Sequence, residues 1–256
     1  MTSQHRSSQR YQRRLVPEEA LLRLRLQLLA RRHPRYGYRR IHAILRREGW
    51  ACNRKRVQRL WRDEGLRLPT KARRRRRGPR MPGHLVADHP DQVWAIDFVS
   101  DRTADGRPIK ILTVTDEHTR EALATPVARR MGADDTVTTL EQIVERRGRA
   151  PALIRCDNGP EFISQALRDW CRFNDSKPGY IELGAPWQNP FVESFNGHLR
   201  RELLEMESFN SLFEAQLLLD DWRQQYNHYR PHQSLNYMTP AEYARQRRTG
   251  KQPELS

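Results

Sequence analysis

Three acidic residues of the chain have the type and placement that phosphoryl-transfer chemistry requires. Asp97 lies in the middle of the strand-like segment 94–98, where a carboxylate is unusual because aspartate has a low β propensity. Asp157 directly follows the apolar segment 152–156, and Glu193 lies among apolar residues in a helix-like stretch. Carboxylates that follow strands in α/β proteins lie at the sheet edge where binding sites form. The three residues therefore predict an acidic site at the edge of a sheet.

Such a site is suited to divalent metal ions. Cleavage and transfer of a phosphodiester develop charge on the attacking and the leaving oxygen, and two ions about 3.5–4 Å apart can stabilise both. Mg²⁺ prefers oxygen ligands and keeps several waters, so a few carboxylates suffice. Three carboxylates held together without a cation would repel one another. We therefore expect Asp97, Asp157 and Glu193 to be catalytic and to bind two Mg²⁺ or Mn²⁺ ions.

The charge of the chain is strongly positive and unevenly spread. The formal net charge is +16, and residues 1–85 contain 26 Lys and Arg against 5 Asp and Glu, whereas residues 86–256 contain 21 against 26. A basic region attached to a near-neutral body indicates binding to a polyanion. A basic solubilising surface is the alternative interpretation.

Several classes of protein are disfavoured by the composition. The sequence has no run of 18 apolar residues, no apolar leader in its first 14 residues and no C-x-x-C pair. We therefore expect no membrane-spanning helix, no secretory signal and no zinc finger. The three scattered cysteines fit a reducing compartment. The expected location is the cytoplasm, in association with the nucleoid.

Residues 1–68 predict a helical DNA-binding region. Segment 17–32 has glutamates at its start, arginines at its end and an apolar side that we assign to Leu21, Leu22, Leu24, Leu28 and Leu29. Two shorter helices, 39–48 and 53–64, follow with a tight turn between them, which is the pattern of a helix-turn-helix. An ordinary helical hairpin is the alternative. The basic residues of the second short helix favour DNA contact, and they are Arg54, Lys55, Arg56, Arg59 and Arg62.

Residues 69–88 predict a basic linker between two domains. Five adjacent arginines repel one another and cannot pack into a core, so we expect them to become ordered on DNA phosphates. They are Arg73, Arg74, Arg75, Arg76 and Arg77.

Residues 89–206 predict an α/β catalytic core, and residues 207–256 a C-terminal helical extension. Segments rich in β-branched and aromatic residues at 92–100, 109–115 and 122–127 indicate three antiparallel strands. Helices and strands then alternate, with helices at 134–147, 161–173, 189–204 and 208–229 and strands at 152–156 and 180–182. The prediction is a mixed five-stranded sheet flanked by helices.

The spacing and wording of these motifs resemble a known family. Asp157 and Glu193 are separated by 35 residues, and with Asp97 on the first strand they resemble the D,D(35)E pattern of retroviral integrases and insertion-sequence transposases. The stretches DNGPEF, PWQNPFVESFNG and YNHYRPHQSLNYMTPAEY resemble the second-frame (OrfB-type) product of bacterial insertion sequences, as does HPRYGYRRIHAILRREG before the core. The resemblance covers roughly residues 33–245.

The resemblance implies a ribonuclease-H-like fold and a DNA transposase, a polynucleotidyl transferase with endonuclease-like cleavage. It assigns the catalytic trio to Asp97, Asp157 and Glu193. It also implies copy-out, paste-in movement, binding to terminal inverted repeats and target DNA, a homo-oligomer on DNA, and an upstream-frame (OrfA-type) partner that frameshifting can fuse to this chain. One departure is Pro190, where such proteins usually have Gly or Ala, and a first helical turn tolerates it.

Other residues and functions stay open at this stage. Arg200 follows Glu193 by two helical turns and is expected either to contact phosphates or to be a surface arginine. His228, Tyr229, Arg230 and His232 are expected either to bind DNA or to brace the core. A DNA-binding regulator with an inactive core, and a nuclease that never joins ends, are the alternative functions. The acidic trio argues against the first, and strand-transfer products would separate the second.

Overall fold

The computed structural model describes residues 17–68, 86–181 and 189–249. The chain divides into two compact units, Met1–Ala72 and Arg73–Ser256. Within the described residues, no helix has the length and apolar character needed to cross a membrane.

The first unit contains three helices, α2 (Pro17–Arg32), α3 (Tyr38–Arg47) and α4 (Arg54–Asp63). The side chain of Asn53 caps α4 by accepting a 2.7 Å hydrogen bond from the backbone N–H of Arg56. The prediction of three helices is confirmed, but the apolar side assigned to α2 is partly wrong. The buried leucines of α2 are Leu22, Leu26 and Leu29, whereas Leu21, Leu24 and Leu28 are more than half exposed.

The second unit is built on a mixed sheet with the strand order β3-β2-β1-β5-β6. The strands are β1 (Val93–Arg102), β2 (Pro108–Asp116), β3 (Ala122–Ala124), β5 (Leu153–Cys156) and β6 (Lys177–Tyr180), and the short β4 (Val127–Ala128) also pairs with β2. Strands β1, β2 and β3 are antiparallel neighbours, and β5 is parallel to both β1 and β6. This order confirms the predicted mixed sheet, although within the described residues the sheet has six strands and the prediction was five.

Several predicted boundaries differ from the structure, and the helix predicted at 208–229 is α8, which spans Leu212–His228. The third predicted strand, 122–127, is divided into β3 and β4, because Pro126 between them has no N–H to donate to a ladder. The helix predicted from residue 161 starts at Gln165, where the side chain of Ser164 caps it. The strand predicted at 180–182 is β6, which begins earlier, at Lys177.

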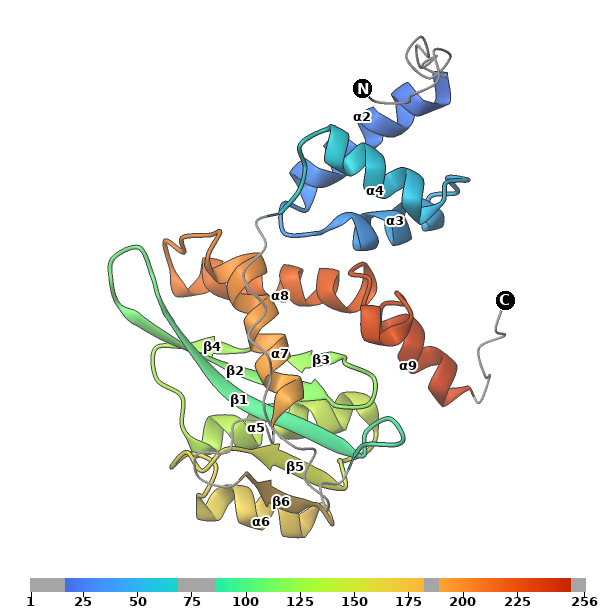
Figure 1. Ribbon diagram of the computed structural model, residues 1–256. Coiled ribbons are helices and arrows are strands. Elements are labelled where there is room, and N and C mark those ends of the chain that lie inside the picture. Colours follow the sequence, from blue (N-terminus) through green and yellow to red (C-terminus); the bar gives the residue numbers. More distant parts are fainter. Residues whose placement is uncertain (1–16, 69–85, 182–188, 250–256) are drawn as a thin grey trace, which may run out of the picture. The chain divides into compact units, whose positions relative to one another are not determined.

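Helices cover both faces of the sheet (Figure 1). Helices α5 (Ala133–Arg147) and α6 (Gln165–Phe173) pack on one face, where Trp94, Ile96, Leu140 and Trp170 belong to one buried cluster. Helices α7 (Pro190–Leu199) and α8 (Leu212–His228) pack on the other, where the second cluster contains Phe195, Leu219 and Trp222. Side chains alternate between the two faces of the sheet along a strand. Neighbouring residues of β1 therefore pack against helices on opposite faces.

The last elements fold back onto the same unit. A π-helical turn, η2 (Arg200–Leu204), continues α7, and a short turn, η3 (Gln233–Leu235), and the helix α9 (Pro240–Arg248) follow α8. The side chain of Asn227 donates to the carbonyl of Ala122 (2.9 Å) and accepts from its N–H (2.8 Å). Asn227 thus supplies hydrogen bonds to the edge strand β3 that a further strand would otherwise provide.

Candidate active site

Asp97 lies at the centre of the candidate site. It is half-buried on β1, opposite Thr113 of β2. Its Oδ1 accepts a 2.7 Å hydrogen bond from the backbone N–H of Phe98, and its Oδ2 accepts a 2.7 Å hydrogen bond from Nδ2 of Asn196 on α7. Both carboxylate oxygens therefore have a fixed donor.

Helix α7 carries Glu193 and Asn196 on one face, because residues three apart are neighbours on a helix. Glu193 is exposed and lies in the first turn of α7, where the helix dipole favours an acidic side chain. Pro190 occupies the first helical position, which it does without losing a hydrogen bond. The Oδ1 of Asn196 accepts a 3.0 Å hydrogen bond from the hydroxyl of Thr113. Asn196 therefore joins the helix that bears Glu193 to the two central strands.

Asp157 reaches the same region through the parallel pairing of β5 with β1. Arg155 of β5 is the register partner of Ala95 of β1. Asp157 and Asp97 each lie two residues further along the chain, so Asp157 comes alongside Asp97. Asp157 is exposed, and its Oδ1 accepts a 2.9 Å hydrogen bond from the N–H of Gly159. A Cβ on Gly159 would lie 3.0 Å from that same oxygen, so a larger residue there would displace the Asp157 carboxylate.

The three carboxylates interact electrostatically. The pKa of Asp97 is raised to about 6, chiefly by burial and also by the negative charges of Asp157 and Glu193, while the hydrogen bonds from Phe98 and Asn196 act in the opposite direction. The structure therefore brings the three predicted residues together, and a cation would relieve their mutual repulsion. Carboxylate oxygens are the donor type that Mg²⁺ prefers. In the described parts of the chain, no three His, Cys, Asp or Glu side chains form a ready-made metal-binding group.

Two nearby residues were not anticipated as a pair. Lys110 of β2 forms an ion pair with Glu161, and its Nζ lies 3.8 Å from the centroid of the Phe98 ring. The ion pair lowers the pKa of Glu161. Glu161 therefore belongs to the framework of the loop after Asp157. Nothing in the local sequence indicates the pair, because 51 residues separate its members.

The predicted DNA-contact residues have different surroundings. Arg54, Lys55 and Arg62 are exposed on α4, whereas Arg59 and Arg56 are half-buried and lie 3.0 and 3.8 Å from Glu19 of α2. Arg200 is exposed where α7 passes into η2. The residues of the predicted linker, Arg73, Arg74, Arg75, Arg76 and Arg77, lie outside the described residues.

For two residues of the segment after α8, Arg230 and His232, the surroundings favour the bracing role. Arg230 is only 1% exposed and makes a two-pronged ion pair with Glu202 of η2, at 2.8 and 2.7 Å. Its Nη2 is also 3.0 Å from Nδ1 of His198. His232 is buried and its ring contacts the ring of Tyr226 edge-on. Arg230 and His232 therefore brace the core beneath the end of α7.

Comparison with known protein families assigns both units. Residues 87–186 and 174–240 match two models described as integrase core domain, and residues 17–77 match a model described as HTH-like domain. The HTH-like match covers the helices α2, α3 and α4. The integrase-core matches together cover all three candidate carboxylates.

Similar proteins come from bacterial insertion elements. An uncharacterized 31.7 kDa protein of insertion element IS407 from Burkholderia multivorans is 40% identical, over 90% of this chain and 83% of its own length. Transposase InsD of insertion element IS2 from Escherichia coli is 29% identical, over 84% of this chain and 75% of its own length. In fold, the chain is similar to a chain of the simian T-cell lymphotropic virus intasome, with a TM-score of 0.56 and 16% identity over 80% of this chain and 72% of that one. The fold is therefore the ribonuclease-H-like integrase core, and the chain belongs to the insertion-element transposases that carry an integrase core domain.

Proposed function

We propose that Asp97, Asp157 and Glu193 are the carboxylates with which this DNA transposase cleaves and joins phosphodiesters. The observation that supports the assignment is the 2.7 Å hydrogen bond from Asn196 to Asp97. It ties the helix that bears Glu193 to the strand that bears Asp97, and the parallel pairing of β5 with β1 brings Asp157 to the same edge.

The same three carboxylates are proposed to bind two Mg²⁺ or Mn²⁺ ions. Bound there, the ions would supply Lewis-acid stabilisation of the attacking and leaving oxygens. The half-buried Asp97 would form the floor of the site, and the exposed Asp157 and Glu193 its two sides. Asn196 and the N–H of Phe98 would keep the carboxylate of Asp97 in one orientation.

The reaction is proposed to have two steps at one site. In the first, water attacks the phosphodiester at the end of the element, and the bond to the 3′-oxygen breaks, which leaves a free 3′-hydroxyl. In the second, that 3′-oxygen attacks a phosphodiester of the target, a new P–O bond forms, and the target strand leaves as its own 3′-hydroxyl with the proton. No covalent bond to the protein forms in either step.

Binding of DNA is proposed to be divided along the chain. Residues 1–68 would contact DNA through the exposed face of α4, chiefly with Arg54, Lys55 and Arg62. Arg56 and Arg59 would contribute less, because each lies within ion-pair distance of Glu19. Residues 69–88, which include Arg73 to Arg77, would follow the phosphates as a basic linker. Residues 89–206 would form the catalytic core with Arg200 near the DNA, and residues 207–256 a helical extension.

The proposed partners are the terminal inverted repeats and the target DNA. The retroviral chain with this fold is part of an intasome, and we extend that to a homo-oligomer of this chain on DNA. An upstream-frame (OrfA-type) product, either separate or fused by frameshifting, would complete the active enzyme. Cleavage and joining of DNA would take place at the nucleoid, in the cytoplasm.

The assignment is tested by variants that remove charge and keep size. Asp97→Asn, Asp157→Asn and Glu193→Gln should each abolish Mg²⁺-dependent nicking and strand transfer on a labelled duplex that carries the end of the element. Asp101→Asn, on the same strand as Asp97, and Asp169→Asn, on the surface of α6, are matched controls that should keep activity. All five variants should bind the duplex as the unchanged chain does. Normal strand transfer by any member of the trio would overturn the assignment.

A further inference from the structure

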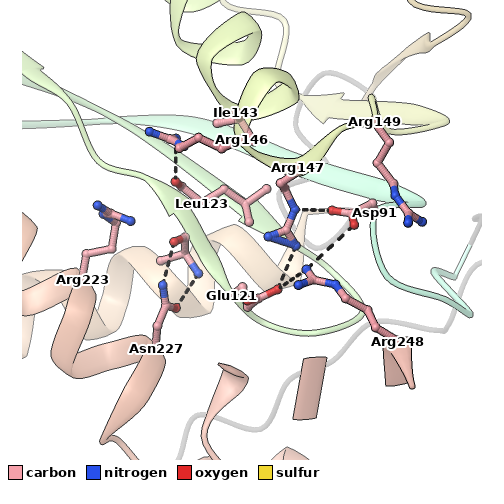
Figure 2. A pocket seen from close by; sticks show the side chains of 11 residues that line it. Asp91, Glu121, Leu123, Ile143, Arg146, Arg147, Arg149, Arg223, Asn227 and Arg248 are labelled. Atoms are coloured by element: carbon pink, nitrogen blue, oxygen red, sulfur yellow. Dashed lines mark hydrogen bonds and ion pairs between the residues drawn. The ribbon is translucent and has the colours of Figure 1, made fainter. Parts of the chain in front are cut away.

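A second polar site lies at the β3 edge of the sheet. An open cavity of about 350 Å³ is lined by the end of α5, the strand β3 and the helices α8 and α9. Figure 2 shows side chains from all of these elements around one space. The residues that line it are Asp91, Glu121, Ala122, Leu123, Ile143, Arg146, Arg147, Arg149, Arg223, Asn227 and Arg248.

The lining contains five arginines and only two carboxylates. One arginine already pairs with both carboxylates, because Arg147 donates to Asp91 from Nε at 2.6 Å and to Glu121 from Nη2 at 2.8 Å. Arg248 lies 3.1 Å from the same oxygen of Glu121. Figure 2 shows Arg147 in the middle of the pocket, with the other four arginines around it. The two acidic charges are therefore engaged inside the pocket, and an excess of positive charge remains.

Three of the surrounding arginines carry this excess. Within the described residues, no carboxylate lies within ion-pair distance of Arg146 or Arg149. Arg146 makes a weak 3.5 Å hydrogen bond to the carbonyl of Leu123. Arg223 pairs at 3.4 Å with Asp220, which is about half exposed. The Nε of Arg223 is shielded from solvent and has no hydrogen-bond partner among the described residues. A shielded N–H donor without a partner is costly, so a ligand with acceptor oxygens would stabilise this arrangement.

The chemistry of the pocket selects an anion with several oxygens. Guanidinium groups present two parallel N–H donors, which match a phosphate group. The cavity of about 350 Å³ has room for a phosphate group. The carboxylates of Asp91 and Glu121, already engaged by Arg147, would repel any anion that lay deeper. The family acts on DNA, whose backbone carries such a phosphate at every nucleotide.

The pocket is separate from the candidate active site. Asp91 precedes β1, and four residues of extended strand, about 13 Å, separate Val93 from Asp97. A phosphate held by Arg149 and Arg223 is therefore not the phosphodiester under attack. It belongs to another position on the same DNA or to a second DNA molecule.

We propose that this arginine pocket binds a backbone phosphate of DNA at a distance from the catalytic carboxylates. The proposal uses the family's action on DNA and does not depend on the roles given to Asp97, Asp157 and Glu193. Its test measures binding, and cleavage is not its readout, so the two proposals can fail independently.

The test replaces the two arginines that lack a structural partner inside the pocket. The double variant Arg149→Ala/Arg223→Ala keeps Arg147 and both of its ion pairs, so the fold should survive, as circular dichroism and a thermal melt would verify. Binding of the full chain to two duplexes of unrelated sequence would be measured by fluorescence anisotropy over a series of salt concentrations. We expect Kd to rise about ten-fold for both duplexes and the slope of log Kd against log salt to become shallower by about 1.

A control double variant removes two positive charges from another part of the same unit. Arg107 and Arg172 are exposed arginines of the same unit, each 3.3 Å from an aspartate on the surface. The double variant Arg107→Ala/Arg172→Ala should change Kd less than two-fold and leave the salt slope unchanged. Equal effects in the two pairs, or none in the pocket pair, would overturn the proposal.

Two further probes separate other occupants of the pocket. Inorganic phosphate should compete weakly with DNA on the unchanged chain and no longer affect the pocket variant. If phosphate raises the melting temperature of the unchanged chain while the pocket variant binds DNA normally, the pocket is a site for free phosphate and the proposal is wrong. Polyglutamate that binds the unchanged chain and loses affinity for the pocket variant, with DNA affinity unchanged, would instead identify an acidic-peptide site and also overturn it.

Discussion

The side chain of Asn196 donates a 2.7 Å hydrogen bond to Oδ2 of Asp97 and accepts a 3.0 Å hydrogen bond from the hydroxyl of Thr113. These two contacts join α7 to the two central strands at the level of the candidate site. The partners are 99 and 83 residues apart in sequence. These hydrogen bonds of Asn196 orient the carboxylate of Asp97 and fix the position of α7, the helix that bears Glu193.

Removal of the Asn196 amide should reduce catalysis without loss of DNA binding. In Asn196→Ala the carboxylate of Asp97 loses one of its two donors, and groups that orient metal ligands typically contribute ten- to hundred-fold to activity. We expect Mg²⁺-dependent cleavage to fall by about that factor, and half-maximal activity to require more Mg²⁺. Asn210→Ala, at an exposed position before α8, is the control. Unchanged cleavage and Mg²⁺ dependence in Asn196→Ala would contradict this role.

The charge on Asp97 should destabilise the metal-free fold in a pH-dependent way. The pKa of Asp97 is raised by burial from 3.8 to about 6. The folded state therefore holds its proton more tightly than the unfolded state, and stability falls as pH rises from about 4 to about 6. Asp97→Asn removes this cost, so the variant should gain stability relative to the unchanged chain as pH rises through that window, reaching about 3 kcal/mol at pH 8.

Urea unfolding of the second unit at several pH values, in the presence of a chelator, measures this difference. The stability gain of Asp97→Asn should be near zero at pH 4 and constant above pH 7. Asp101→Asn should show no such window. Added Mg²⁺ should stabilise the unchanged chain more than Asp97→Asn. A gain that did not depend on pH would contradict the raised pKa.

Gly159 should be required for the position of the Asp157 carboxylate. An added Cβ would lie 3.0 Å from Oδ1 of Asp157 and 3.2 Å from Oε2 of Glu161, so both carboxylates would have to move. Gly159→Ala should lower cleavage about ten-fold and change the free energy of unfolding by less than about 1 kcal/mol. Gly132→Ala is the control, because its Cβ would meet no atom nearer than 3.9 Å. Cleavage that fell equally in both variants would count against a specific role for Gly159.

Arg230 should contribute to stability through its buried ion pair with Glu202. Arg230→Ala leaves the carboxylate of Glu202 without its main partner in a buried position, which typically costs about 3–5 kcal/mol. The double variant Arg230→Met/Glu202→Leu removes both charges and should recover most of that loss. Arg245→Ala, on the exposed side of α9, should be nearly neutral. Urea unfolding measures all three, and a double variant less stable than Arg230→Ala would refute the interpretation.

Local sequence patterns were sufficient to predict most helices and strands and to single out Asp97, Asp157 and Glu193. The caps, glycines and apolar periods that define α3, α4 and β1 lie within a few residues of one another, so they can be read in order along the chain. The separation of 35 residues between Asp157 and Glu193 is equally a property of the sequence. The structure then brought these two residues within electrostatic range of Asp97.

Other features were decided only by tertiary packing. The leucines of α2 form two adjacent stripes of equal hydropathy, and contact with the rest of the first unit selects Leu22, Leu26 and Leu29 for burial. Arg230 resembles a DNA-binding residue in the sequence, but the fold provides Glu202 as its partner.

The arginine pocket illustrates the limit of the sequence most directly. Its lining residues are spread from position 91 to position 248, and they come together only where α5, β3, α8 and α9 meet. The physical reason is range, because propensities and caps act over one or two helical turns. Ion pairs and side-chain hydrogen bonds between distant residues depend instead on how whole elements pack. The sequence by itself therefore determined which residues are candidates for the chemistry, and the tertiary structure decided which groups orient them and which arginines meet in one pocket.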